Sequence, residues 1–214
     1  MKWHGFVQAG GGSTRFGRDK ALANIAGKTM LQRTGELLES VCDEVRIIAP
    51  CGKYHGMTWK VIEDGWPGEG PLGGILTALQ LLKSQRADPA DQHSEAEPGW
   101  GMILGCDLPF MNRDFLMFLK ERALASRAQV VVPESDNGLE PLCACWRADA
   151  LPAVEQAFDA GVRKVTEAMK HVGMEVLDEA AWTRFDNGNR LFWNMNTPED
   201  FREACRVLET GIHE

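Results

Sequence analysis

The chain has 214 residues, of which 44% are hydrophobic and 25% are charged, and this composition excludes wholesale disorder, collagen-like repeats and coiled-coil rods. Its 23 Lys and Arg residues against 31 Asp and Glu residues give a formal net charge of −8, so we expect no general surface for nucleic acid. No apolar run approaches the roughly 18 residues of a membrane span, and the glycine-rich start is too short for a signal peptide. We therefore expect a cytoplasmic protein without membrane or nucleic-acid partners.

Strand-like apolar stretches alternate along the chain with segments in which apolar residues recur at helical spacing. We predict strands over residues 3–9, 45–49, 59–62, 101–106, 129–132, 142–146 and 172–177. We predict helices over residues 30–41, 72–83, 113–125, 152–160 and 198–208. This alternation is typical of βαβ units and predicts an α/β fold in which helices cover both faces of the sheet.

Two helix starts have a clear local cause. Asn112 and Thr197 are good N-cap residues, and Thr197 is followed by a proline at the first helical position and by Asp200 three residues after the cap. In contrast, the polar segment 84–98 contains two prolines and no large apolar residue, so we expect a mobile surface loop. No linker is visible, and residues 1–214 are therefore expected to form one domain.

The first predicted strand runs into three consecutive glycines, residues 10–12. Such glycines let backbone N–H groups approach a phosphate chain without obstruction by side chains. Three cations follow within six residues of an otherwise acidic chain: Arg15, Arg18 and Lys20. The loop is not a P-loop, because Arg18 and Asp19 stand where Lys and Ser or Thr should be, and Arg15 occupies the third-glycine position of a dinucleotide fingerprint. We expect an anion site here, the alternative being a tight glycine turn with a solvated basic flank.

Asp107 comes just after the apolar run 102–104, at the expected carboxyl end of a central strand. Open α/β sheets bind their ligands at this end of the strands. One aspartate can suffice for Mg²⁺, which fills its coordination shell with waters and substrate phosphate oxygens. The sequence therefore favours a magnesium site at Asp107 over an Asp-Leu-Pro turn that only ends the strand.

Three further segments could line the same site. Two glycines in a first helical turn, at 73–74, destabilise the helix, so we expect a ligand or a strand to approach them closely. Asn194 and Asn196 alternate and would face the same way in an extended segment. The basic pair at 163–164 could bind the phosphate of an anionic acceptor, the alternative being an exposed basic helix start. A fourth candidate is Asp64, for which a role in the site and a role as a turn residue before Gly65 are equally good explanations.

The string A-G-G-x-S-x-R-F-G-x-D-K-A-L, which starts at Ala9, resembles the opening motif of the molybdenum cofactor guanylyltransferase family of MobA-like nucleotidyltransferases. Further matches follow in order over nearly the whole chain: I-E-D at 62–64, G-P-L-G-G at 70–74, C-D-L-P at 106–109, P-L at 141–142 and N-M-N-T-P-E at 194–199. The resemblance implies a three-layer α/β/α, Rossmann-like nucleotidyltransferase fold with a mostly parallel mixed sheet.

The resemblance also implies an activity, the Mg²⁺-dependent transfer of GMP from GTP to molybdopterin with release of pyrophosphate. The implied catalytic residues are Arg15, Lys20 and Asp107, with Asp107 as the metal ligand. The implied nucleotide-binding residues are Gln8, Ala9, Gly10, Gly11, Gly12, Ser13, Lys20, Asp64 and Asp107. We assign to acceptor binding Gly70, Gly74, Arg163, Lys164, Asn194 and Asn196. Transient contact with molybdenum-insertion proteins or apo-molybdoenzymes is a further expectation.

Two departures from the family's pattern bear on the choice of base. Gln8 stands where the family usually has Leu, and residues 48–50 lack the asparagine often found after the second strand. Residues 9–11 match the guanylyl branch, whereas cytidylyl relatives tend to carry A-A-G there. The alternatives are a molybdopterin cytidylyltransferase, another small-molecule nucleotidyltransferase and, from a different class, a nucleotide-binding partner of molybdoenzymes that performs no chemistry.

Overall fold

The computed structural model describes residues 2–10, 19–84, 99–186 and 188–210. In this part of the chain a central eight-stranded sheet has the order β10-β7-β9-β6-β1-β4-β5, and the short β8 pairs with β7. The strands are β1 (His4–Gln8), β4 (Glu44–Ala49), β5 (Lys60–Glu63), β6 (Trp100–Gly105), β7 (Val130–Ser135), β8 (Gly138–Leu139), β9 (Cys143–Arg147) and β10 (Met174–Leu177). β9 is antiparallel to both of its neighbours and β8 is antiparallel to β7, whereas the remaining pairs are parallel. The predicted mixed, mostly parallel sheet is confirmed.

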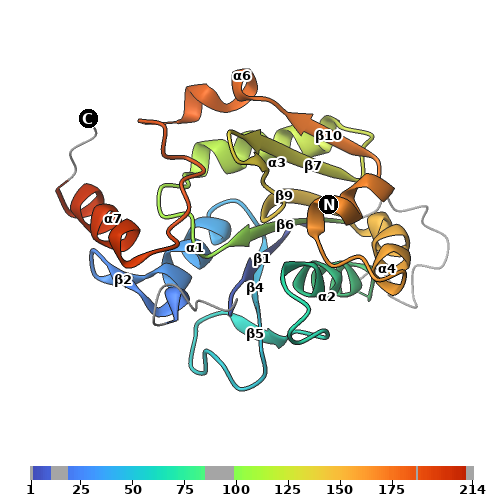
Figure 1. The fold of residues 1–214 in the computed structure, drawn as a ribbon, viewed down its shortest axis with the longest axis horizontal. Helices are drawn as coiled ribbons and strands as arrows, with labels where there is room; N and C mark the ends of the chain where they lie inside the picture. Colours follow the sequence, from blue (N-terminus) through green and yellow to red (C-terminus); the bar gives the residue numbers. More distant parts are fainter. Residues whose placement is uncertain (1, 11–18, 85–98, 187, 211–214) are drawn as a thin grey trace.

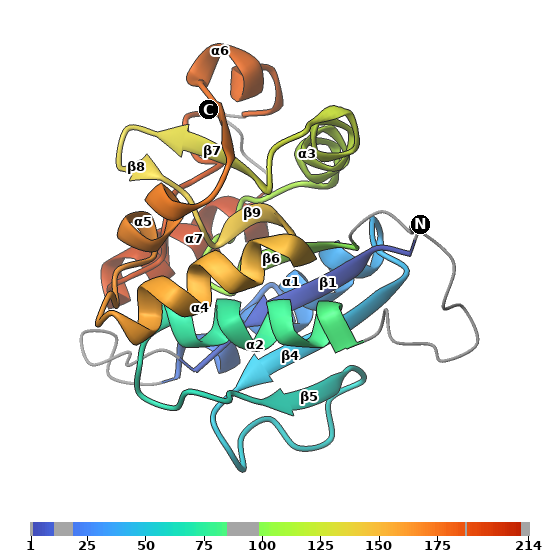
Figure 2. The same cartoon turned by 90° about the vertical axis from the view of Figure 1, so that its right-hand side faces the viewer.

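Helices cover both faces of this sheet (Figure 1, Figure 2). One face packs against α1 (Met30–Glu39) and α3 (Arg113–Ala125); the other packs against α2 (Pro71–Ser84), α4 (Leu151–Asp159) and the short α5 (Val165–Ala168). Because side chains alternate along a strand, Val7 of β1 belongs to the first core cluster and Phe6 to the second, and both are fully buried. The three-layer α/β/α arrangement is therefore also confirmed.

Three helices begin at residues whose side chains satisfy free backbone N–H groups. Asn112 accepts a hydrogen bond from Phe115 N at 3.0 Å and so caps α3, as the sequence predicts. Thr197 Oγ1 accepts from Asp200 N at 3.1 Å before α7 (Pro198–Thr210), which confirms the second predicted cap. Thr29 forms a capping box with Gln32 at the start of α1, and this signal was not read from the sequence.

A small hairpin of β2 (Asn24–Ile25) and β3 (Lys28–Thr29) stands apart from the main sheet and packs against α7 (Figure 1). The core between them contains Ile25, Met30, Met195 and Ala204. The sequence did not predict this hairpin. Its two turn residues, Ala26 and Gly27, have φ values of 49° and 83°, and a left-handed alanine carries no recognisable turn signal.

Only the first residue of the expected loop 84–98 is among the described residues. Ser84, expected in the loop, is the last residue of α2, and its hydroxyl donates to Leu81 O at 2.8 Å. The remainder of the expected loop lies outside the described residues. Within the four described ranges, no helix combines the length and the apolar character that crossing a bilayer would require.

Candidate active site

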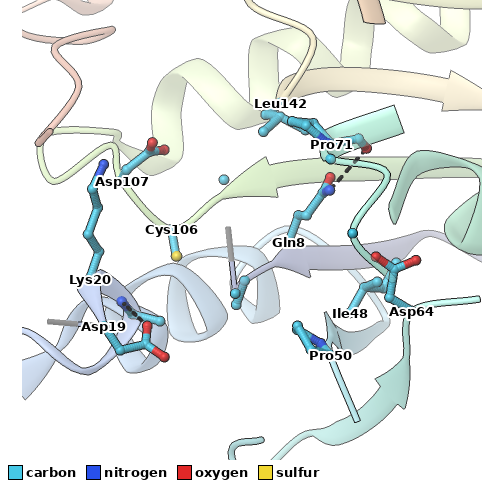
Figure 3. A pocket seen from close by; sticks show the side chains of 16 residues that line it. Gln8, Asp19, Lys20, Ile48, Pro50, Asp64, Pro71, Cys106, Asp107 and Leu142 are labelled. Atoms are coloured by element: carbon cyan, nitrogen blue, oxygen red, sulfur yellow. Dashed lines mark hydrogen bonds between the residues drawn. The ribbon is translucent and has the colours of Figure 1, made fainter. Parts of the chain in front are cut away.

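A cavity of about 410 Å³ opens at the carboxyl ends of β1, β4, β5 and β6 (Figure 3). It is lined by the residues that end β1, by those that follow β4 and β6, by Asp64 after β5, and by the segment before α2. This is the edge at which parallel strands present their last residues to a ligand. Gln8, Lys20, Asp64 and Asp107, which the sequence singles out, lie together around this cavity.

Asp107 and Lys20 are two side chains of opposite charge that line the cavity. Asp107 follows β6 by two residues, and in Figure 3 the Lys20 side chain extends toward its carboxylate. Burial raises the pKa of the Asp107 carboxyl, and the nearby Lys20 ammonium opposes that increase. Lys20 itself lies in a short 3₁₀ turn, Lys20–Leu22, which begins where Asp19 Oδ1 accepts a hydrogen bond from Ala21 N at 3.1 Å. Asp19 has no role among the residues predicted from the sequence, although an aspartate directly before a helical turn is a typical cap.

The segment before α7 joins this pair from the far end of the chain. Lys20 Nζ donates to Asn196 Oδ1 at 2.6 Å, and Met195 N donates to the main-chain carbonyl of Asp107 at 2.9 Å. Asn196 N in turn donates to Asp200 Oδ2 at 2.7 Å. Although burial of Asp200 favours its neutral form, hydrogen bonds from 196–197 lower its pKa overall, so it stays ionised and anchors the segment.

Asp64 is held in one orientation at the entrance to α2. Its Oδ1 accepts a hydrogen bond from Trp66 N at 3.0 Å and from the Thr77 hydroxyl at 3.2 Å. The same hydroxyl accepts from Gly65 N at 3.0 Å. Asp64 is therefore both a turn residue and part of the cavity lining, so its predicted role as a turn residue and its predicted role in the site are compatible.

Two glycines at or near the cavity are closely packed. Gly10 has a φ of +97°, and a Cβ built on it would lie 2.3 Å from Pro50 Cδ. A Cβ on Gly74 would lie 2.3 Å from Gln8 Nε2, which donates to Pro71 O at 3.0 Å. The sequence predicts that either a ligand or a strand approaches the glycines of α2. The structure shows a strand residue, Gln8 of β1, against Gly74.

The residues assigned to an acceptor lie at different distances from the cavity. Gly70 lines it, whereas Gly74, Arg163, Lys164, Asn194 and Asn196 are not among its described lining residues. Arg163 forms an ion pair with Glu69, the neighbour of Gly70, and its guanidinium lies 4.0 Å from the Phe158 ring centroid. Lys164 is the exposed N-cap residue of α5. Asn194 Nδ2 donates to Phe192 O at 3.3 Å, so only Asn196 of the asparagine pair contacts Lys20.

Five of the residues that the sequence singles out lie outside the described residues, namely Gly11, Gly12, Ser13, Arg15 and Arg18. The described side chains at the cavity can be compared with the ligands that Mg²⁺ requires. Among them no group of three or more His, Cys, Asp or Glu side chains forms a cage for a metal ion. Three carboxylates from the described part of the chain line the cavity, those of Asp19, Asp64 and Asp107. Asp19 is engaged by Tyr54 and Lys53, and Asp64 by Thr77 and Trp66 N, whereas Asp107 fits a Mg²⁺ ion that takes its other ligands from water and substrate phosphates.

Comparison with known proteins agrees with this geometry. The sequence profile of the MobA-like NTP transferase domain matches residues 5–172. The chain belongs to this family. It is therefore a nucleotidyltransferase, and the resemblance stated from its motifs is confirmed.

Curated relatives of this nucleotidyltransferase match it over nearly their whole length. A Deinococcus radiodurans protein named "probable molybdenum cofactor guanylyltransferase" is 31% identical over 206 residues, which cover 96% of this chain and 95% of the relative. The molybdenum cofactor guanylyltransferase of Desulfosudis oleivorans is 28% identical over 209 residues, 97% of this chain and 96% of the relative.

Solved structures share the fold of this nucleotidyltransferase. Molybdopterin-guanine dinucleotide biosynthesis protein A from Archaeoglobus fulgidus superposes with a TM-score of 0.78 at 21% identity, covering 97% of this chain and 99% of that one. The 2-C-methyl-D-erythritol 4-phosphate cytidylyltransferase from Thermus thermophilus has a TM-score of 0.66 at 14% identity, with 98% and 100% covered. At these identities the likeness concerns the fold alone.

Proposed function

We propose that this chain transfers GMP from GTP to molybdopterin, releasing pyrophosphate and forming the guanine dinucleotide form of the molybdenum cofactor. The observation that carries the proposal is that Asp107 and Lys20 line the same cavity at the carboxyl ends of the central strands, close enough for the Lys20 ammonium to oppose the rise in the pKa of Asp107. Its support is the family and the full-length relatives whose names state molybdenum cofactor guanylyltransferase.

The proposed reaction is an in-line displacement at the α-phosphorus of GTP. A terminal phosphate oxygen of the acceptor forms the new bond to the α-phosphorus, and the bond from that phosphorus to the α,β-bridging oxygen breaks. The electron pair of the broken bond leaves with pyrophosphate. Because the attacking oxygen is already anionic, no general base is needed. Catalysis then depends on positioning and on stabilisation of charge on the phosphates.

The cavity residues divide this work between them. Lys20, held by Asn196 at 2.6 Å, presents an ammonium that neutralises charge on the triphosphate. Arg15 is assigned the same task by the resemblance. Asp107 would hold Mg²⁺, which would supply positive charge to stabilise the phosphates.

Nucleotide recognition is assigned to the ends of β1 and β5. Gln8 is the last residue of β1, and Ala9 and Gly10 follow it beside the cavity. The orientation of Asp64 is fixed by Thr77 and Trp66 N. The family resemblance assigns residues 11–13 to nucleotide binding as well.

The acceptor would enter from the side of Gly70. Arg163 lies next to this entrance but is paired with Glu69 and stacked on Phe158. An acceptor phosphate would therefore have to exchange places with the Glu69 carboxylate to bind the Arg163 guanidinium. Lys164, Asn194 and Asn196 are the other residues that we propose for the acceptor.

The experiment that tests this proposal follows the two ends of GTP separately. With molybdopterin and Mg²⁺ present, label in the α-phosphate is expected in the dinucleotide product and label in the γ-phosphate in pyrophosphate. Asp107→Ala is expected to abolish both products, whereas Glu121→Gln, which removes an exposed carboxylate on α3, leaves them unchanged. Release of α-label as free GMP, or of γ-label as inorganic phosphate, would show hydrolysis and contradict the proposal.

A further inference from the structure

Tyr54, in the connection between β4 and β5, contacts the loop that carries Lys20. Its hydroxyl donates to the Asp19 carboxylate, with 3.0 Å to Oδ1 and 2.9 Å to Oδ2. Lys53 Nζ lies 3.1 Å from the same carboxylate. Asp19 Oδ1 also accepts from Ala21 N at 3.1 Å. One carboxylate therefore joins the β4–β5 connection to the 3₁₀ turn that begins at Lys20.

The backbone and the burial of Tyr54 indicate that this contact is built into the fold. Tyr54 has a φ of +58°, which is unfavourable for a residue with a Cβ, yet its side chain is only 8% exposed. Its ring packs in the same core cluster as Ala9 and Ala21. Burial raises the pKa of the Tyr54 hydroxyl, and the hydrogen bond to Asp19 raises it further, so the hydroxyl remains a donor at neutral pH. Strained residues of this kind persist where surrounding contacts fix them, often at functional sites.

The position of Asp19 gives the contact a consequence for phosphate binding. Asp19 and Lys20 both line the cavity, so a negative carboxylate lies beside the cation assigned to the triphosphate. Left unpaired, that carboxylate would repel phosphate oxygens and compete for the Lys20 ammonium. Tyr54 and Lys53 instead engage it, and Lys20 reaches Asn196.

We propose that Tyr54 is a positioning residue for nucleotidyl transfer: by holding the Asp19 carboxylate, it orients the turn that presents Lys20 to the triphosphate. This inference rests on the proposed function, because it assigns Lys20 to the phosphates of GTP. Tyr54 acts through Asp19, because its hydroxyl bonds to that carboxylate and not to Lys20 or Asp107.

The test is a double-mutant cycle. Tyr54→Phe removes only the hydroxyl and keeps the buried ring, and Asp19→Asn removes the charge but keeps an oxygen for Ala21 N. Each single variant is expected to lower kcat/KM for GTP about tenfold, the equivalent of about 1.4 kcal/mol for one hydrogen bond to a charged group. The double variant is expected to lose less than the product of the two single effects, because both substitutions weaken the same contact.

Two controls separate positioning from a general loss of structure. The KM for the acceptor at saturating GTP is expected to stay within about twofold, since a defect in Lys20 orientation acts on the triphosphate. Lys53→Met, which breaks a more exposed ion pair with side chains 44% and 24% exposed, is expected to cost less than about threefold. All variants are assayed at least 15 °C below their own unfolding midpoints, so partial unfolding does not enter.

A wild-type measurement needs no variant. Tyr54 is the single tyrosine of the chain, so incorporation of 3-fluorotyrosine gives one ¹⁹F resonance, which is expected to shift when GTP saturates the protein. Wild-type values of kcat and KM for GTP in Tyr54→Phe, multiplicative effects in the double variant, or an unmoved resonance would each overturn the inference. Absence of GTP turnover in the wild-type protein would instead overturn the proposed function, so the two failures are distinguishable.

Discussion

Replacing Gly10 by Ala tests why the glycine loop must begin with glycine. Two effects add at this position. A φ of +97° strains any residue with a Cβ by about 1–2 kcal/mol, and the new Cβ would lie 2.3 Å from Pro50 Cδ and 3.0 Å from Pro50 Cγ. Overpacking against a rigid ring costs about 1–3 kcal/mol more. We expect Gly10→Ala to reduce the free energy of unfolding by about 2–5 kcal/mol.

The matched control is the same substitution in a Pro50→Ala background. There the overpacking term disappears and only the backbone strain of about 1–2 kcal/mol remains. Urea unfolding of the four proteins gives both costs and a coupling energy, which we expect to be about 1–3 kcal/mol. Equal costs in the two backgrounds would refute the packing argument, and a negligible cost in both would refute the backbone argument as well.

Three further predictions concern the cavity and the residues next to it. Burial, partly offset by Lys20, raises the pKa of Asp107, so its carboxylate destabilises the fold at pH values above the pKa of the unfolded state, about 3.9. Asp107→Asn is therefore expected to raise the urea midpoint of the metal-free protein at pH 7, and this gain is expected to vanish as the pH falls toward 4. A lowered midpoint at pH 7 would contradict this prediction. Gly74→Ala is expected to stabilise α2 by about 0.5–1 kcal/mol in a Gln8→Ala background and to lose that gain in the wild type, where the new Cβ would displace the Gln8 amide; the same change in both backgrounds would disprove the contact. Asn196→Ala removes the acceptor 2.6 Å from Lys20 Nζ, and we expect kcat/KM for GTP to fall about tenfold or more, with no change in kcat/KM counting against a role for this contact.

The layers of the fold were predictable because their signals are local. The alternation of Phe6 and Val7 between two faces of β1 follows from strand geometry, and the caps at Asn112 and Thr197 follow from side-chain oxygens placed just before helices. Asp107 could be placed at the cavity from its position after a buried strand. Each of these inferences needs only a few neighbouring residues.

Contacts between distant segments could not be predicted in the same way. Lys20 and Asn196 are 176 residues apart, and Tyr54 lies 35 residues from Asp19. Their meeting depends on how connections cross the carboxyl edge of the sheet, which no local pattern records. Gly74 shows the intermediate case, because its cost in a helix revealed that something approaches it but not that the partner is Gln8.

The most direct measurement is pyrophosphate release by the purified protein with Mg²⁺ and molybdopterin, supplied separately with GTP, CTP, ATP and UTP. The account predicts release that depends on molybdopterin and occurs with GTP and not with the other three. Release with CTP in place of GTP would contradict the base assignment and keep the transfer mechanism. No release with any of the four would contradict the central claim that this cavity transfers a nucleotide to molybdopterin.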